Sequence, residues 1–132
     1  MWYYNNQPVT EPPADYIGFV YLIENLSNGR LYVGKKLFKF TRSKQVKGKR
    51  KKVLVDSDWL DYYGSNDELK EDVVRLGKEN FRRTILYYCK NKGSMSYLEL
   101  REQIDRRVLE SDQYYNSWIS VKIHKKHVKI DS

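Results

Sequence analysis

Residues 18–35 of the chain have the sequence GFVYLIENLSNGRLYVGK. Two short apolar runs flank the polar turn NLSNG. An Asn-Gly pair between apolar runs is typical of a β-hairpin, so we expect strands at about residues 17–24 and 31–36. Each run contains one of the tyrosines Tyr21 and Tyr32, so the hairpin is expected to bring two phenols together.

A dense cationic run follows the predicted hairpin. Ten Lys and Arg residues and no acid lie between Lys35 and Lys52. Residues 39–53 are too cationic to be buried and contain Gly48, which predicts a mobile basic loop inserted after the hairpin. Phenols beside such a run indicate chemistry on a phosphate backbone.

The overall composition predicts a single basic domain. The chain has 132 residues, a formal net charge of +8 and an isoelectric point near 9.5. This charge favours a polyanionic partner, with nucleic acid the commonest and an anionic membrane surface the alternative. No apolar run approaches the ~18 residues of a transmembrane helix, so no membrane span is expected.

The cysteine content and the N-terminal residues predict an intracellular location. Cys89 is the only cysteine, so it cannot form an internal disulfide, and its apolar neighbours predict a buried strand residue in a reducing compartment. The N-terminus lacks the basic and apolar regions of a secretory signal. The protein is therefore expected to be cytoplasmic and not secreted.

Outside the hairpin, the sequence predicts an arm, a helix and a third strand. Residues 1–16 contain all three prolines and are expected to form an extended N-terminal arm. A capping box at Ser65-Asn66-Asp67-Glu68 predicts a helix at roughly 66–76, and Gly77 fits its C-terminal cap. The apolar run Phe81–Cys89 predicts a strand.

A second helix and a basic tail complete the expected domain, which spans residues 17–120. A capping box at Ser96-Tyr97-Leu98-Glu99 predicts a helix that ends near Glu110. Its expected apolar stripe consists of Tyr97, Leu100, Ile104 and Val108. Alternating residues from Trp118 to Ile130 predict an edge strand that runs into a basic C-terminal tail, residues 121–132.

Two triplets in the hairpin, Phe19-Val20-Tyr21 and Tyr32-Val33-Gly34, resemble the signature of the GIY-YIG nucleases. Phe19 and Val20 stand where the family has Gly-Ile, with Gly18 displaced by one residue, which is a conservative change for a strand. Three further residues follow in the family's order, namely Arg42, Glu99 and Asn116. The resemblance covers residues 18–116 and is closest to small free-standing phage-type homing-like endonucleases.

The resemblance implies a fold and an activity. The implied fold is α+β, with a small three-stranded antiparallel-type sheet flanked by helices. The implied activity is metal-dependent hydrolysis of DNA phosphodiester bonds with Mg²⁺ or Mn²⁺, in the nucleoid or in a phage-infected host cell. One site per chain implies nicking, or a transient homodimer on DNA that cuts both strands.

The resemblance also implies roles for the tyrosines and the cationic residues of the site. Tyr32 would activate the attacking water, with help from Tyr21 and Lys35. A phenol has an ordinary pKa near 10, and nearby cations favour its phenolate form. Arg42 would clamp the scissile phosphate, because a guanidinium presents a rigid fork to phosphate oxygens.

Glu99 is the implied ligand of a single divalent cation, which suits magnesium with its several bound waters. Glu102, one helical turn on, is the alternative ligand, and Glu99 also has a purely local explanation as the last residue of its capping box. Asn116 would orient its segment through backbone hydrogen bonds. Its neighbour Tyr115 has two open interpretations, as a core residue or as a group that stacks on DNA or contacts phosphate.

The other cations of the basic run are expected to make sequence-independent contacts with phosphates. They are Lys36, Lys39, Lys44, Lys47, Lys49, Arg50, Lys51 and Lys52. His124 and His127 are expected to belong to a solvated basic tail that contacts DNA.

Two other functions fit parts of the pattern. A non-catalytic, basic nucleic-acid-binding module explains the charge and the aromatic content, but not the order of the five signature positions. A structural or assembly protein predicts no salt-sensitive binding to DNA.

Overall fold

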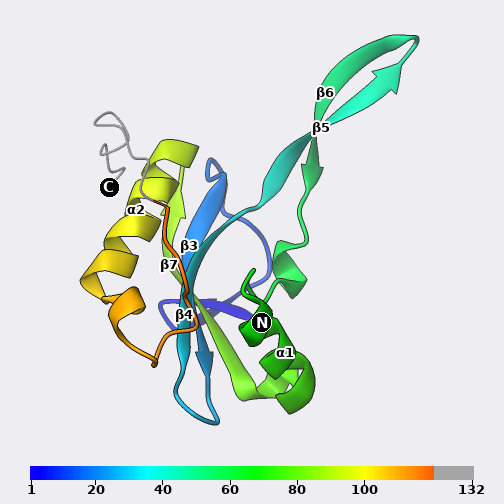
Figure 1. Cartoon of the computed structure of the whole chain (residues 1–132). Coiled ribbons are helices and arrows are strands. Elements are labelled where there is room, and N and C mark those ends of the chain that lie inside the picture. Colours follow the sequence, from blue (N-terminus) through cyan, green and yellow to red (C-terminus); the bar gives the residue numbers. More distant parts are fainter. Residues whose placement is uncertain (121–132) are drawn as a thin grey trace.

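The computed structural model describes residues 1–120 as an α+β domain with a projecting β-ribbon (Figure 1). Its strands are β1 (Trp2–Tyr4), β2 (Gln7–Val9), β3 (Gly18–Asn25), β4 (Leu31–Leu37), β5 (Lys39–Val46), β6 (Lys49–Asp56) and β7 (Phe81–Cys89). Its helices are α1 (Asp67–Leu76) and α2 (Lys92–Asp105), with 3-10 turns at Trp59–Asp61, Lys78–Asn80 and Val108–Glu110. Five strands form one mixed sheet in the order β2-β1-β7-β3-β4, and β5 and β6 form a second sheet.

The predicted hairpin and third strand form the centre of the five-stranded sheet. β3 pairs with β4 and with β7, in both cases antiparallel, and the ladder to β7 has an irregularity between Val20 and Tyr21. Tyr21 lies opposite Gly34, and Tyr32 lies opposite Ile23. Because directly opposed residues share a face of the sheet, this register puts both phenols on the same face.

The expected N-terminal arm is in fact part of the sheet. β1 and β2 form a hairpin, and β1 pairs in parallel with β7, so the sheet has five strands where three were expected. Trp2 explains the difference, because its indole is fully buried and donates a hydrogen bond to the Trp59 carbonyl at 2.6 Å. Burial of one such aromatic side chain favours docking by about 2–3 kcal/mol.

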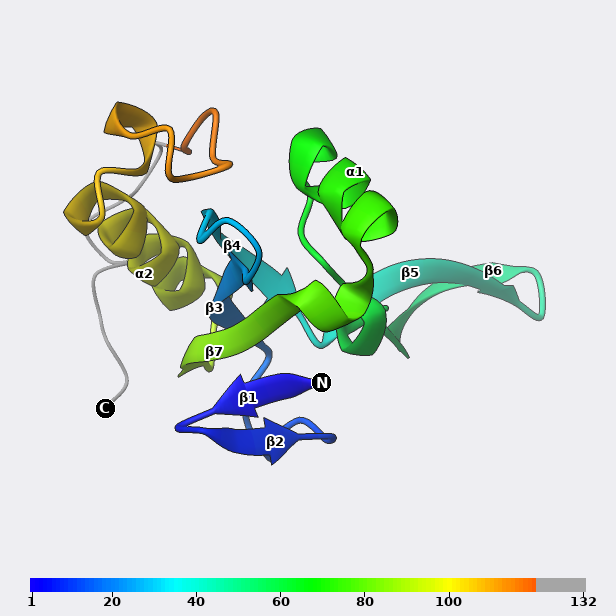
Figure 2. The same cartoon turned by 90° about the horizontal axis from the view of Figure 1, so that it is seen from below.

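The two helices cover different faces of the sheet, which the two views show (Figures 1 and 2). α1 contributes Leu69 and Val73 to a core that includes the aromatic side chains of β1 and β3. α2 contributes Met95 and Leu98 to a second core, on the face of the sheet that carries Val20, Val33 and Cys89. Cys89 is thus the buried strand residue that the sequence predicts.

α1 agrees with its prediction except at its first residue. Its N-cap is Asn66, whose side chain accepts a hydrogen bond from the Leu69 amide at 2.9 Å. Ser65 therefore does not cap the helix, and its hydroxyl is available for other contacts. Gly77 ends the helix with a φ of 92°, as a C-terminal glycine does.

α2 begins earlier than predicted, and its buried face is different. Asn91 is the N-cap, with its side chain accepting from the Ser94 amide at 2.8 Å, so Ser96 and Glu99 lie inside the helix and form no capping box. The predicted stripe is only partly correct, because Tyr97 packs against the core and Val108 is buried, but Val108 lies beyond the helix and Ile104 is 56% exposed. The buried face contains Ser94, Met95, Leu98 and Gln103, two of which an apolar pattern cannot identify.

Residues 39–53, predicted as a mobile loop, instead form most of the β5–β6 ribbon (Figure 1). The strands pair from Lys39–Asp56 to Val46–Lys49. Lys47 and Gly48 connect them, with φ of 51° and 74°. Positive φ at both central residues is the requirement of a type I′ hairpin turn, which matches the twist of the flanking strands.

Two further expectations concern the C-terminal part of the chain and the membrane. Residues 117–120 are not a strand, and the rest of the expected edge strand, the basic tail and both histidines lie beyond residue 120, outside the described residues. Neither α-helix in residues 1–120 has the length and apolar character that a bilayer span requires.

Candidate active site

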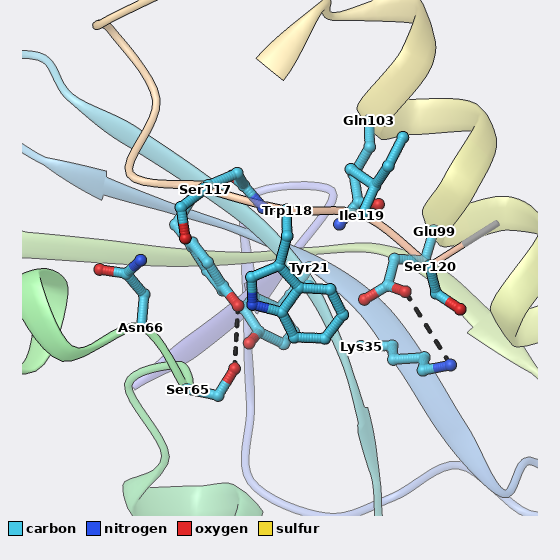
Figure 3. Close-up of a pocket in the computed structure, with 13 residues that line it drawn as sticks. Tyr21, Lys35, Ser65, Asn66, Glu99, Gln103, Ser117, Trp118, Ile119 and Ser120 are labelled. Carbon is cyan, nitrogen blue, oxygen red and sulfur yellow. Dashed lines mark hydrogen bonds and ion pairs between the residues drawn. The ribbon is translucent and has the colours of Figure 1, made fainter. Parts of the chain in front are cut away.

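A pocket of about 420 Å³ lies along the edge strand β4, beside α2 and the segments at residues 65–66 and 116–120 (Figure 3). Five of the six predicted catalytic side chains line it, namely Tyr21, Tyr32, Lys35, Glu99 and Asn116. Because β4 is an edge strand, its residues reach the pocket from both faces of the sheet. Tyr32 and Gly34 come from the α1 face, and Lys35 comes from the α2 face.

The two phenols pack against each other above Gly34. Their ring centroids are 6.2 Å apart, and Tyr21 is 1% exposed. A Cβ atom at Gly34 would collide with the Tyr21 hydroxyl and would lie 3.0 Å from Cε2 of Tyr32. The glycine that closes the second triplet is therefore required because both rings occupy the space of its side chain.

We predict that Gly34→Ala distorts the site. The methyl group must displace Tyr21, which is fully packed, so the free energy of unfolding should fall by about 1–3 kcal/mol. Thermal unfolding measures this change. An unfolding midpoint equal to that of the parent would show that the phenols do not lie where the structure has them.

Tyr32 is the more accessible of the two phenols, and its hydroxyl is 2.9 Å from the Ser65 hydroxyl. Burial raises the pKa of Tyr32, an effect that the hydrogen bond to Ser65 only partly offsets. The sequence suggested instead that Lys35 favours the phenolate. That expectation fails because the Lys35 ammonium donates to the Ser96 hydroxyl at 2.8 Å and lies 3.9 Å from the Glu99 carboxylate (Figure 3).

Glu99 lies in the pocket, and Glu102 is engaged elsewhere. Burial raises the pKa of the Glu99 carboxyl, and Lys35 partly opposes this shift. Glu102 accepts hydrogen bonds from the Tyr87 hydroxyl at 2.8 Å and the Arg106 guanidinium at 2.9 Å, and it does not line the pocket. Glu99 also has no capping role, so the local explanation of this residue does not fit the structure.

Asn116 connects the C-terminal segment to β4. Its side chain accepts from the Val33 amide at 3.0 Å and donates to the Val33 carbonyl at 2.8 Å, as the backbone of a further strand would do. This is the backbone contact that the sequence suggests. Tyr115 is a core residue, 3% exposed, whose hydroxyl donates to Asp72 at 2.7 Å and accepts from Asn25 at 2.9 Å.

Arg42 is the predicted catalytic residue that does not join the pocket. It lies on β5 with its guanidinium 5.3 Å from the Phe40 ring centroid, and it is exposed. The position was expected in a loop that could fold back, but the pairing of Arg42 with Val53 holds it on the ribbon. Among residues 1–120, Lys35 is the only cationic residue that lines the pocket.

Seven residues of the pocket lining were not predicted as site residues from the sequence. They are Ser65, Asn66, Gln103, Ser117, Trp118, Ile119 and Ser120. Gln103 donates to the Val33 carbonyl at 3.2 Å, which directs its amide oxygen away from that carbonyl. This oxygen is buried and has no hydrogen-bond partner among residues 1–120. The Trp118 indole is 73% exposed and lies in front of Tyr21 in Figure 3. Their positions follow from tertiary packing, and no local pattern indicates them.

The pocket suits a divalent cation held by one carboxylate and neutral oxygens. Glu99 supplies a largely buried carboxylate, and Gln103, four residues later on α2, supplies the unpartnered oxygen. Within residues 1–120 no three His, Cys, Asp or Glu side chains cluster as a metal site. Magnesium keeps several waters and binds through one or two carboxylates plus substrate oxygens, so this donor set fits it.

A comparison with models of protein families gives a match that covers the residues of this pocket. A family model described as "Putative endonuclease segE, GIY-YIG domain" matches residues 2–119. No curated protein and no solved structure matches the chain. The match includes the phenol pair, Glu99 and Asn116, all of which line one pocket. The chain therefore belongs to the GIY-YIG endonuclease family of the SegE type.

Proposed function

We propose that this protein hydrolyses DNA phosphodiester bonds with a divalent cation, magnesium or manganese, in the β4 pocket. The observation that carries the proposal is the convergence of two phenols, a lysine and a buried carboxylate, from β3, β4 and α2. A purely structural cluster gives no reason to bury the Glu99 carboxylate with Lys35, at 3.9 Å, as its one cationic partner within residues 1–120.

The phenol pair is proposed to position the attacking water. Tyr32 presents its hydroxyl at the pocket with Ser65 as its partner, so it can accept a hydrogen bond from the attacking water while it donates its own to the serine. Tyr21 is fully buried and supports the Tyr32 ring. Burial raises the pKa of both phenols, which keeps them neutral and suited to donating or accepting hydrogen bonds.

The charged residues are proposed to bind the phosphate and the cation. Glu99 is the ligand of the cation, and a bound divalent cation would stabilise the charge that develops on the phosphate. Lys35 is held by Ser96 and Glu99, so it is available as a fixed positive charge at the pocket. We assign the charge-offsetting role to Lys35 and place Arg42 with the ribbon residues that contact flanking phosphates.

The remaining cations of the basic run are proposed to supply affinity that is independent of sequence. Each phosphate neutralised by Lys or Arg releases counterions and steepens the salt dependence of binding. Seven lysines are assigned this role: Lys36, Lys39, Lys44, Lys47, Lys49, Lys51 and Lys52. Lys36 differs from the rest, because its ammonium is 2.6 Å from the Asp58 carboxylate.

Nicking of supercoiled plasmid tests the proposal. The purified chain should convert supercoiled DNA to the open-circular form with Mg²⁺ and should fail to do so with EDTA. A non-catalytic binding module would shift the plasmid in a gel under both conditions without cutting it. Absence of Mg²⁺-dependent nicking by folded protein that binds the plasmid would overturn the proposal.

The pH dependence of cutting provides a prediction for Lys35. Cleavage requires ionised Glu99, whose pKa is raised by burial. As the pH is lowered, the rate should therefore begin to fall at a higher pH than it would with an ordinary glutamate. Lys35 opposes this rise, so in Lys35→Met the pKa rises further and the acid limb moves to higher pH.

Single-turnover nicking between about pH 5 and 9 measures that limb. Lys36→Met is the matched control, since it removes a neighbouring charge that is paired with Asp58 and leaves the Glu99 pocket unchanged. Its acid limb should stay in the parent's position. A Lys35→Met limb that stays in place, or moves to lower pH, would contradict the assignment.

A further inference from the structure

The β5–β6 ribbon is a formed element that projects beyond the rest of the domain (Figure 1). Each strand has eight residues, and the strands pair along their whole length. At about 3.3 Å per residue the ribbon is roughly 26 Å long. The type I′ turn at Lys47 and Gly48 fixes the register, so the side chains of the ribbon have a defined order in space.

The register divides the ribbon into two faces, because directly opposed residues point to the same side. One face carries the pairs Arg42–Val53, Lys44–Lys51 and Val46–Lys49. The other face carries the pairs Thr41–Leu54, Ser43–Lys52 and Gln45–Arg50. The first face combines cations with aliphatic groups, and the second carries two hydroxyls, an amide, a guanidinium, an ammonium and the exposed Leu54.

The charges of the ribbon have few partners within residues 1–120. Within residues 1–120, the ribbon has a single ion pair, in which Lys39 lies 3.8 Å from Asp56. Lys44 lies directly opposite Lys51. Like charges in directly opposed positions destabilise a β-ladder, and a polyanion removes this repulsion. The ribbon is therefore suited to a negatively charged partner.

The dimensions of the ribbon select a groove of duplex DNA. The major groove is about 12 Å wide and admits a two-stranded ribbon, whereas the minor groove is only about 6 Å wide. Two strands lie about 4.8 Å apart before their side chains are counted, so the ribbon exceeds the minor groove.

We propose that the β5–β6 ribbon enters the major groove of duplex DNA and that the Gln45–Arg50 pair contacts base edges there. The inference rests on the proposed function, since it takes DNA as the substrate. Within residues 1–120 neither side chain has a hydrogen bond to the protein, and both are exposed. A carboxamide can bond adenine, and a guanidinium can bond guanine, through two hydrogen bonds each.

The presence of Gln45 favours contact with bases over binding to phosphates alone. A neutral amide releases no counterions, so it adds nothing to the salt-dependent, electrostatic part of the affinity that the cations supply. Contact with an adenine edge gives it a role. The long side chains of Lys44 and Lys51 can reach phosphates on the walls of the groove. The ribbon would thus give this small domain sequence preference without a second domain.

Selection of binding sites from a random duplex pool tests the proposal. The probe is a 30-base-pair duplex with a randomised centre, and binding is measured in EDTA so that no cutting occurs. The parent should enrich a preferred sequence. Arg50→Lys should lose a guanine preference of about 5- to 150-fold at one base pair, while its affinity for the unselected pool stays within about twofold of the parent.

Lys49→Ala is the matched control, because Lys49 is the neighbour of Arg50 on the opposite face. It should weaken binding to all sequences equally and reduce the salt slope by about one. Gln45→Ala should lose an adenine preference at a different base pair. A parent that enriches no sequence, or Arg50→Lys and Gln45→Ala variants that keep the parent's preferences, would overturn the proposal.

Two further measurements separate this proposal from the nuclease assignment. Methyl green, which occupies the major groove, should displace the protein from duplex, and netropsin, which occupies the minor groove, should not. The reverse pattern overturns the groove assignment. Replacement of residues 43–52 by Asn-Gly keeps the paired base of the ribbon and should lower duplex affinity at least tenfold. This shortened chain should still nick plasmid with Mg²⁺ at raised concentration, which tests catalysis independently; duplex affinity equal to the parent's would overturn the ribbon's role.

Discussion

Glu99→Gln should lower Mg²⁺-dependent nicking by about 10³-fold or more. A bound cation contributes several kcal/mol of charge stabilisation in the transition state, and each 1.36 kcal/mol is a factor of ten in rate. The amide has the shape of the carboxylate but not its charge, so the fold and the binding of duplex should be retained. Single-turnover nicking with a parallel gel-shift titration measures both.

Glu102→Gln is the matched control for this substitution. Glu102 lies on the same helix three residues later, but its carboxylate is bound to Tyr87 and Arg106 outside the pocket. Loss of these contacts should cost about 1–3 kcal/mol of stability and leave metal-dependent cutting largely intact. Nicking that survives Glu99→Gln and is abolished by Glu102→Gln would reverse the assignment of the metal ligand.

The stability of Glu99→Gln provides a second readout that does not depend on cutting. Because burial raises the pKa of Glu99 in the folded state, its charged form destabilises the folded chain when no cation is bound. The favourable contribution of the protonated carboxyl is present below the unfolded pKa, about 4.3, and is lost as pH rises through the folded pKa. The variant should therefore melt above the parent in EDTA at pH 7, and the difference should shrink toward pH 4.

Magnesium should stabilise the parent against unfolding much more than it stabilises Glu99→Gln. A ligand that binds only the folded state raises the melting temperature, so Mg²⁺ should stabilise the parent and have little effect on Glu99→Gln. Equal stabilisation of both proteins would show that the cation binds elsewhere.

The parts of the fold that the sequence predicts correctly depend on local patterns. Two short apolar runs and an Asn-Gly turn specify the β3–β4 hairpin, and the pleat then puts Tyr21 and Tyr32 on the same face. A polar N-terminal residue and an amphipathic run specify α1. Each of these features is encoded within about ten residues, so propensity and periodicity suffice.

The incorrect predictions concern features that depend on contacts distant in sequence. Trp2 joins the sheet because it packs in a core assembled from β3, β7 and the segment at Trp59. α2 buries Ser94 and Gln103, and the Gln103 amide donates to the Val33 carbonyl; an apolar count cannot detect such buried polar residues. The charge of residues 39–53 suggested a loop. Charge prevents these residues from being buried, but it does not prevent strand pairing. A ribbon that is exposed on both faces allows the strands to pair while the charges stay in solvent.

In the candidate site, too, some residues could be predicted from the sequence, and others are placed by contacts distant in sequence. The sequence places the phenols, Lys35, Glu99 and Asn116 in order, and the fold brings these five to one pocket. Arg42 is the exception, because spacing along the chain says nothing about the direction in which an inserted ribbon leaves the sheet. Ser65 was expected to cap α1, and only the tertiary structure brings it to the Tyr32 hydroxyl.

Tyr32→Phe should lower the rate of nicking by about 10²–10⁴-fold, which is the usual contribution of a positioned acid–base group. The substitution removes one oxygen and keeps the ring that packs against Tyr21, so the melting temperature should change little. Duplex binding in EDTA should equal that of the parent, because phosphate contacts come from the cations. The loss should therefore appear in the single-turnover rate at saturating protein and not in the apparent affinity.

Ser65→Ala separates the phenol from its hydrogen-bond partner. It leaves the Tyr32 hydroxyl in the pocket and removes one hydrogen bond of about 1 kcal/mol, so we expect a rate loss of about fivefold. If Tyr32 acts on water directly, its removal must cost far more than removal of the serine. Nicking by Tyr32→Phe at the parent's rate would exclude the phenol from the chemistry. A loss in Ser65→Ala as large as that in Tyr32→Phe would show instead that the serine hydroxyl, held by the phenol, is the group that contacts the attacking water.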